Sequence, residues 1–571
     1  MKFDRIFIFC YSFLVLCLEI GDFSITPENI EELKNFVNNL MSCKKIVGLG
    51  LTLVYDNKVI FADGFGMANI EKRISVDKNS KFAIGSLTKA FTSTIIAKVL
   101  SENTRYNWDT PIKDILGDEF RLFDGVRTDN VNLRDLLGHK VGVPGYFEPL
   151  LVGFPENTSR EDFIKNIQYQ PPVAPIRTKF IYSNYFYALA GYVAEKITGR
   201  SWEHLVQEYL FNPLCMKNSG FVDHISSFDE FALGYSYIKE TPVKLKEELL
   251  YTSSPSGPAG SIYSTPKDMG EWILLHLNTG KDSSGHNLVD NATLKETYRG
   301  QMATPLFGNL FKPGFPISDV VISYNMGWLS SVYRGYRRLW HSGGIVGYSS
   351  LLWLFPDKKV GIYASMTGSK SNGNSEAIKT ILSRSADMLL GLEPWLNDST
   401  ACSFPEPWIK KTPVVYPLDE IVPEPFWNIS TQQDDYVGFY CNPAFGMMKI
   451  QKQNLQLVMR YGRFGKMKLY PITETAFDVR YIEALWFVTN SDDNVTPVRI
   501  TFGSDFNSLV YPIDRLYSNT TFSRNCNVNV DSSHLQGNGG NIMHFIHDTR
   551  SYLKSYLLML NLFVILFIQC Q

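Results

Sequence analysis

The sequence predicts an α+β protein, with helices packed on an antiparallel sheet, followed by a small antiparallel β-barrel or sandwich. Two observations predict the first part: strand-like runs lie near both ends of the region 45–390, and helical patterns lie between them. A third observation predicts the second part, because short alternating runs separated by Gly, Asn and Asp turns fill the region 434–520.

The strands of the first part are expected as two hairpins. Residues 49–66 read as two β-branched and aromatic runs around the turn Asp56–Lys58. Residues 349–366 read as two more strands around Pro356 and Asp357. We expect these first and last segments to meet in one sheet.

Two long helices are expected between the hairpins. Residues 86–100 carry apolar side chains at helical spacing, which indicates a helix that is buried over much of its surface. Residues 185–199 repeat the pattern, with Gly199 placed to end the helix. Repeated prolines then disfavour continuous helix or central strand, and they predict a linker over residues 391–432.

The composition is that of an ordinary folded protein. The chain has 571 residues, 44% hydrophobic and 20% charged, with a formal net charge of −2. At roughly 100–200 residues per domain, this length suggests about two to four units. Long runs of Lys or Arg are absent from the sequence, so we exclude nucleic acid as a partner.

Both ends of the chain carry apolar runs. Residues 1–21 place basic residues before the run Ile6–Leu18, which predicts a secretory signal peptide; a buried first helix is the alternative. Residues 537–571 combine a polar spacer with the apolar run Tyr556–Ile568, which is the pattern of a GPI-anchor signal. A short membrane anchor and a packed terminal helix are the alternatives for this tail. We expect an extracellular or cell-surface protein that is attached to the membrane through its tail.

Cysteines and glycosylation sequons agree with export. Outside the terminal segments the number of cysteines is odd, so one thiol should be unpaired, and spacing does not give their connectivity. These cysteines are Cys43, Cys215, Cys402, Cys441 and Cys526. The N-x-S/T sequons, which would accept glycans in an exported chain, are at Asn157, Asn291, Asn397, Asn428, Asn494 and Asn519.

A serine and a lysine stand three residues apart where the first long helix is expected to begin. Residues three apart share a helix face, so the Lys89 ammonium can lie beside the Ser86 hydroxyl. A serine hydroxyl needs such a neighbour before it can attack a carbonyl. The alternative is a capped helix with a surface lysine.

Two further motifs follow in order along the chain. The stretch "YSNYFYALAGY" holds Tyr182 and Asn184, and "WHSGGIVGYSS" holds His341 and the three residues after it. The order of the three motifs is similar to the signature of serine β-lactamases and penicillin-binding proteins, which is S-x-x-K, then [SY]-x-N, then [KH]-[ST]-G. Neighbouring blocks, such as "LRDLLGHKVGVPGY" and "PAGSIYSTPKDMGEW", resemble class C β-lactamase-related hydrolases of the peptidase S12 type.

The resemblance covers about residues 45–390 and implies a β-lactamase/transpeptidase-like fold. The region 434–520 is similar to the lipocalin-like domain that often follows this fold in peptidase members. The resemblance implies Ser86 as nucleophile, with Lys89 and Tyr182 as candidate bases and Asn184 as a residue that positions Lys89 and the substrate amide. Which of the two bases removes the proton stays open.

The resemblance implies an oxyanion hole made of the backbone NH groups of Ser86 and Gly344. Ser342 and Gly343 complete the [KH]-[ST]-G motif that begins at His341. His341 stands where β-lactamases carry a lysine. A histidine is mostly neutral at about pH 7.4, so the fixed charge for a substrate carboxylate is missing and antibiotic cleavage is disfavoured. A structural histidine at a strand edge is the alternative.

The sequence therefore predicts an exported serine hydrolase that acts through an acyl-enzyme on a small peptide, amide or ester. A catalytically inactive binding or adhesion protein and a transacylase are the alternative functions. Walker and G-x-G-x-x-G motifs are missing, and the pair His544 and His547 lacks a third ligand, so we assign no cofactor and no metal. Oligomeric state and natural substrate do not follow from the sequence.

Overall fold

The computed structural model describes residues 25–156, 158–238, 240–253, 255–304, 309–368, 374–409, 427, 429–490, 498–514 and 518–524. Several sequence predictions lie outside these residues: the signal peptide 1–21, the tail 537–571 with its two histidines, and the sequons at Asn157, Asn428 and Asn494. Among the helices that are described, none is both long enough and apolar enough to cross a bilayer.

An antiparallel sheet of nine strands forms the centre of the first domain, in the order β3-β2-β1-β14-β13-β12-β11-β10-β9. β1 pairs with β14, with Gly48 opposite Thr367, so the first and last strands meet in one sheet as the sequence predicts. The strands are β1 (Gly48–Tyr55), β2 (Lys58–Asn69), β3 (Ile74–Ser75), β9 (Met302–Ala303), β10 (Asp319–Tyr324), β11 (Leu329–Tyr333), β12 (Tyr336–Ile345), β13 (Tyr348–Phe355) and β14 (Val360–Thr367).

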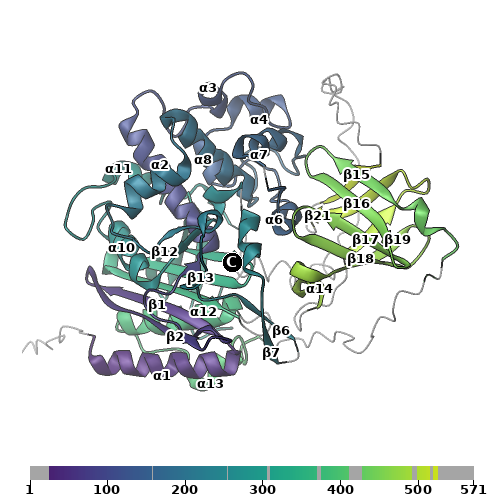
Figure 1. The fold of residues 1–571 in the computed structure, drawn as a ribbon. Helices are drawn as coiled ribbons and strands as arrows, with labels where there is room; N and C mark the ends of the chain where they lie inside the picture. The colour runs from purple at the N-terminus through teal and green to yellow at the C-terminus, as the bar shows by residue number, and fades with distance from the viewer. Residues whose placement is uncertain are drawn as a thin grey trace, which may run out of the picture.

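Helices cover both faces of this sheet (Figure 1). One face shares a hydrophobic core with α1 and α12, and the other with α2, α8 and α10. Because both faces are covered, β13 and β14 are buried along their whole length, which explains their continuous apolar runs. These helices are α1 (Pro27–Lys44), α2 (Thr88–Glu102), α8 (Asn184–Thr198), α10 (Pro266–Leu277) and α12 (Asn374–Leu389).

Shorter elements surround α2 and α8. As predicted, α8 ends at Gly199, whose left-handed φ of 70° suits glycine. A small sheet in the order β4-β8-β5 and the hairpin β6–β7 complete the domain. The elements are α3 (Ile112–Leu116), α4 (Gly125–Asn130), α5 (Leu133–Leu137), α6 (Phe147–Val152), α7 (Arg160–Asn166), α9 (Trp202–Val206), α11 (Asn291–Glu296), β4 (Phe82–Ala83), β5 (Gly220–Phe221), β6 (Tyr235–Ile238), β7 (Thr241–Lys244) and β8 (Ile262–Ser264).

The first part of the predicted linker packs against the sheet domain. A short helix, α13 (Asp398–Ser403), fits between the prolines and is capped by Asn397. A disulfide between Cys43 and Cys402 ties α13 to the end of α1. Cys441 is also disulfide-bonded, and Cys215 is a free thiol at the surface.

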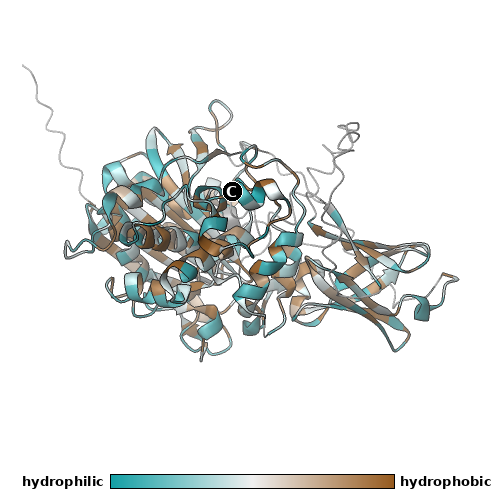
Figure 2. Cartoon of the chain, turned by 90° about the horizontal axis from the view of Figure 1, so that it is seen from above, coloured by the Kyte–Doolittle hydropathy of each residue, from teal (hydrophilic) through white to brown (hydrophobic). Residues whose placement is uncertain are grey.

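The second domain is a closed antiparallel barrel, as the sequence predicts. Its strands alternate buried and partly exposed residues, and Figure 2 shows the matching alternation of hydrophobic and hydrophilic residues. The elements are β15 (Gly438–Asn442), β16 (Gly446–Gln453), β17 (Gln456–Tyr461), β18 (Gly465–Pro471), β19 (Ala476–Tyr481), α14 (Phe487–Asn490), β20 (Val498–Phe502), β21 (Ser508–Asp514) and β22 (Ser518–Ser523).

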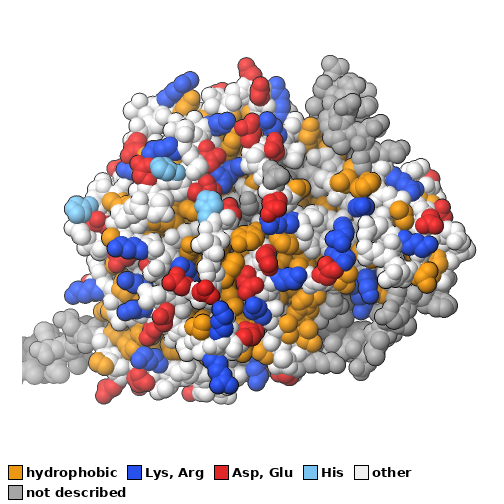
Figure 3. All heavy atoms as spheres, in the orientation of Figure 1, with side chains coloured by type: hydrophobic (Ala, Val, Ile, Leu, Met, Phe, Trp, Pro, Cys, Tyr) orange, Lys and Arg blue, Asp and Glu red, His pale blue; other side chains and the backbone are white. Residues whose placement is uncertain are grey.

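The barrel contacts the first domain through α6, which lies against β21 (Figure 1). The hydroxyl of Tyr511 donates a hydrogen bond of 2.7 Å to Oε1 of the buried Glu148. The backbone NH of Phe464 donates to the carbonyl of Val152 at 2.8 Å. On the face of the molecule shown in Figure 3, acidic and basic side chains are interspersed.

Candidate active site

Ser86 lies in a 3₁₀ turn, η1 (Gly85–Leu87), immediately before α2. The sequence predicts a helix that starts at Ser86 itself, whereas the α-helix begins at Thr88. The turn packs closely on β12: a Cβ added to Gly343 would lie 1.9 Å from the carbonyl oxygen of Ile84. Gly85 has a φ of 51°, and a Cβ there would lie 2.8 Å from the backbone nitrogen of Gly344. Glycines at these positions therefore let the two backbones approach each other.

Lys89 is fully buried and points at Ser86. Its Nζ lies 3.0 Å from Ser86 Oγ, 2.6 Å from Asn184 Oδ1 and 2.7 Å from the carbonyl oxygen of Ala259. The last two atoms can only accept hydrogen bonds, so they fix the direction of two N–H donors. Asn184 is the first residue of α8, which places it opposite α2.

Tyr182 contacts the serine from the segment that precedes α8. Its hydroxyl lies 2.9 Å from Ser86 Oγ, and Lys89 Nζ lies 4.8 Å from the centre of its ring. Both candidate bases named from the sequence are thus within hydrogen-bond distance of the same oxygen. This geometry suits proton transfer from Ser86 to either partner.

His341 is enclosed within the protein, with 1% of its surface exposed. Its Nδ1 lies 2.6 Å from the carbonyl oxygen of Ser342, and its Nε2 lies 3.0 Å from the hydroxyl of Tyr324. Because a carbonyl can only accept, Nδ1 carries the proton and Nε2 accepts from Tyr324. Burial, together with the nearby charge of Lys89, lowers the pKa of His341 to about 3. The residue is therefore neutral near pH 7 and presents no positive charge to a substrate.

The remaining motif residues lie where β12 meets η1. Ser342 is buried, and Gly343 and Gly344 pair with Ser350 and Ser349 of β13. Gly344 lies close to Gly85, so the backbone around Ser86 and the backbone at Gly344, which together form the expected oxyanion hole, are neighbours.

Two contacts of this site were not predicted from the sequence. The carbonyl of Ala259, at the end of the turn η6 (Gly257–Ala259), accepts from Lys89, and the hydroxyl of Tyr324 donates to His341. The sequence did contain a signal for the first contact, because Ala259 lies in the block "PAGSIYSTPKDMGEW" that resembles the hydrolase family. Tyr324 lies in β10 and carries no motif that marks it.

Comparison with known proteins agrees with this geometry. The family model described as Beta-lactamase matches residues 33–383, which is more than half of the chain. The chain belongs to the Beta-lactamase family. Its fold is the β-lactamase/transpeptidase fold of penicillin-binding-protein-like hydrolases, followed by the closed barrel.

The curated proteins that the chain resembles include a hydrolase. The chain is 28% identical to Unguisins hydrolase ungD of Aspergillus violaceofuscus, over 56% of this chain and 58% of that protein. It is 22% identical to Protein flp of Staphylococcus aureus strain MW2, over 63% of this chain and 66% of that protein. The chain thus spans less than two thirds of the length of these relatives.

Solved structures share the fold at low sequence identity. A penicillin-binding protein homologue from Pyrococcus abyssi, described as octameric, aligns with a TM-score of 0.52 and 20% identity over 86% of this chain and all of that one. A D-amino acid amidase from Ochrobactrum anthropi aligns with a TM-score of 0.52 and 19% identity over 64% of this chain and 98% of that one. At this level of identity the alignments show the fold alone.

Proposed function

We propose that the protein is an exported serine hydrolase that cleaves a peptide, amide or ester bond through an acyl-enzyme on Ser86. One observation carries the proposal: Lys89 Nζ and the Tyr182 hydroxyl both lie within hydrogen-bond distance of Ser86 Oγ, at 3.0 and 2.9 Å. A buried lysine directed at a serine by a backbone carbonyl is an arrangement that activates a nucleophile.

In the proposed reaction, Ser86 Oγ attacks the substrate carbonyl while its proton passes to Lys89 or Tyr182. The oxyanion is held by the backbone NH groups of Ser86 and Gly344. When the tetrahedral intermediate collapses, the proton is delivered to the leaving amine or alcohol, and the acyl group stays on Ser86. A water molecule then attacks this ester and gives a proton to the same base. The base returns that proton to Ser86 Oγ as the acid is released, which restores the free enzyme.

The protonation state of Lys89 decides which base acts. As a charged ammonium it would donate to Ser86, Asn184 and Ala259, which leaves Tyr182 to take the proton. As a neutral amine it would donate to Asn184 and Ala259 and accept the proton from Ser86 itself. Both forms fit the same three contacts.

An uncharged amide or ester is the substrate class we propose. Neutral His341 leaves the third motif without the cation that would pair with a substrate carboxylate. One relative is named as a hydrolase of unguisins, which agrees with a hydrolytic reaction.

We also propose that the chain enters the secretory pathway and is attached to the membrane through its tail. The disulfides at Cys43–Cys402 and Cys441 support an oxidising compartment. The sequons that are described, Asn291, Asn397 and Asn519, are all at exposed residues. Glycosidase treatment should reduce the mass of the cellular protein, and phospholipase treatment or truncation at Asn541 should release it; an unchanged mass and unchanged membrane association would refute this part.

The test of the enzymatic proposal is turnover of a chromogenic ester by wild-type protein and by Ser86→Ala. Removing the nucleophile should reduce kcat by at least about 10³-fold while circular dichroism shows an intact fold. Wild-type turnover in Ser86→Ala would refute the proposed nucleophile. A folded wild-type protein that is inert to esters, amides and serine-directed reagents would favour the binding-protein alternative.

A further inference from the structure

A buried histidine outside the three catalytic motifs packs against the candidate base Tyr182. The ring of His139 lies 4.2 Å from the ring of Tyr182, centre to centre, and His139 has no exposed surface. Its Nδ1 accepts a hydrogen bond of 3.1 Å from the backbone NH of Ser183. Its own carbonyl accepts one of 3.0 Å from the backbone NH of Ile181. His139 therefore contacts Tyr182 and the residues on both sides of it.

The environment of His139 fixes one tautomer. Because Nδ1 accepts from a backbone NH, the proton of the neutral ring is on Nε2. Within the described part of the chain, Nε2 has no hydrogen-bond partner, and the ring is packed among Phe180, Tyr187 and Tyr324. Burial, and then the positive charge of Lys89, hold the pKa of His139 well below its usual value. The ring thus stays neutral and keeps Nδ1 available as an acceptor.

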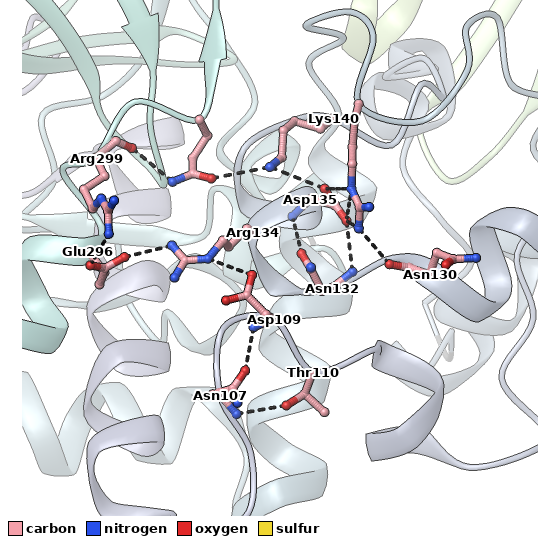
Figure 4. Close-up of polar contacts among 12 residues, drawn as sticks. Asn107, Asp109, Thr110, Asn130, Asn132, Arg134, Asp135, Lys140, Glu296 and Arg299 are labelled. Carbon is pink, nitrogen blue, oxygen red and sulfur yellow. Dashed lines mark hydrogen bonds and ion pairs between the residues drawn. The ribbon is translucent and has the colours of Figure 1, made fainter.

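Polar contacts hold Asp135 and Lys140, which precede and follow His139 in the sequence, and Figure 4 shows these two residues in their network. The buried carboxylate of Asp135 accepts hydrogen bonds from Arg177 at 2.9 and 2.7 Å and pairs with Lys140 at 3.4 Å. The backbone NH of Arg177 donates to the carbonyl of Lys140 at 2.7 Å, and Lys140 Nζ donates to Gln301 at 3.4 Å. These contacts fix residues on either side of His139, whose φ of 56° is left-handed.

We propose that His139 is a positioning residue that holds the Tyr182 hydroxyl against Ser86 by clamping residues 181–183 and packing on the tyrosine ring. This inference rests on the proposed function, because it assigns a role in the reaction of Ser86. His139 acts through Tyr182, which itself lies 2.9 Å from the nucleophile. A shift of about 1 Å in such a group lowers the rate of the chemical step by about 10²-fold.

Two variants remove different parts of the contact. His139→Asn keeps an acceptor near the position of Nδ1 and suits a left-handed φ, but it lacks the ring. His139→Phe keeps a ring and lacks the acceptor. With a chromogenic ester we expect kcat to fall by about 10- to 100-fold in His139→Phe and less in His139→Asn, with KM unchanged in both.

His276 provides the matched control. It is also a buried histidine, its Nδ1 lies 2.5 Å from the Tyr298 hydroxyl, and its Nε2 likewise has no partner in the described chain. Its described ring contacts are with Trp272, Tyr298 and Trp328 rather than with Tyr182. His276→Asn should lower the melting temperature about as much as His139→Asn and leave kcat within about twofold of wild type.

The outcomes separate this inference from the proposed function. Wild-type kcat in folded His139→Phe and His139→Asn, beside an inactive Ser86→Ala, would overturn the role of His139 and leave the nucleophile in place. Equal losses of kcat in the His139 and His276 variants would overturn it too, since stability alone would explain them. If His139→Phe does not fold, a fall in kcat at unchanged KM in His139→Asn supports the proposal, and wild-type kcat there overturns it. Activity in Ser86→Ala would refute the proposed function instead.

Discussion

At the scale of single residues, burial sets the charge of the histidines inside the protein. His341 and His276 are both buried, and burial lowers the pKa of each to about 3. Each is therefore neutral in the folded protein between about pH 3 and 6.5, where a histidine of the unfolded chain binds a proton. The sequence showed that His341 replaces a lysine, but its hydrogen bond to Tyr324 depends on contacts between β10 and β12 that no local pattern gives.

These depressed pKa values predict acid sensitivity. Below about pH 6.5 the unfolded state takes up a proton that the folded state excludes, so the free energy of unfolding falls by about 1.4 kcal/mol per pH unit for each such histidine. His276→Asn removes one of them. Between pH 7 and pH 5 the free energy of unfolding of this variant should therefore fall by about 2 kcal/mol less than that of wild type. Urea unfolding of both proteins at the two pH values measures this, and equal losses would contradict the neutral state of His276.

At the scale of elements, the site depends on the contact between η1 and β12. The two hairpins β1–β2 and β13–β14, α8 and the barrel follow from hydrophobic periodicity and turn residues in the sequence, whereas β9, β10 and β11 were not predicted. The place of Ser86 does not, because the 3₁₀ turn that carries it is shaped by Gly85 and by its approach to Gly344. Similarly, α13 forms within the predicted linker because a disulfide and an N-cap hold a short stretch between prolines.

The contact of η1 with β12 can be tested by one added methyl group. In Gly343→Ala the new Cβ would meet the carbonyl oxygen of Ile84 at 1.9 Å, so η1 and Ser86 must move. A displacement of about 1 Å should reduce kcat/KM by about 10²-fold. Gly125→Ala is the control, because nothing lies within 4 Å of its added Cβ. Steady-state kinetics on a chromogenic ester would contradict this account if Gly343→Ala had wild-type kcat/KM.

At the scale of the whole molecule, contacts distant in sequence join the parts of the chain. The Cys43–Cys402 disulfide links residues 359 positions apart and fastens α13 to α1. The barrel is joined to the first domain through α6, where Tyr511 bonds to Glu148. The sequence placed a β domain after the proline-rich region, but it gave neither the disulfide pairing nor this contact, since both depend on three-dimensional packing.

Loss of this long-range link should destabilise the protein. Replacing both Cys43 and Cys402 with serine should lower the free energy of unfolding by about 2–5 kcal/mol, because the unfolded chain regains the freedom of a long loop. Cys215→Ser is the control, since this exposed thiol is free. Denaturant unfolding under non-reducing conditions compares the variants. Equal stability of the double variant and wild type would show that packing alone holds α13 on α1.

The central claim is that Ser86 is an activated nucleophile, and intact-mass spectrometry after exposure to a fluorophosphonate probe tests it most directly. The experiment compares residues 26–530 of the wild-type sequence with the same segment carrying Ser86→Ala. The account predicts a single adduct that peptide mapping places on Ser86, close to Lys89 and Tyr182, and that is missing from the variant. A folded protein that forms no adduct, or one that is labelled equally in Ser86→Ala, would contradict it.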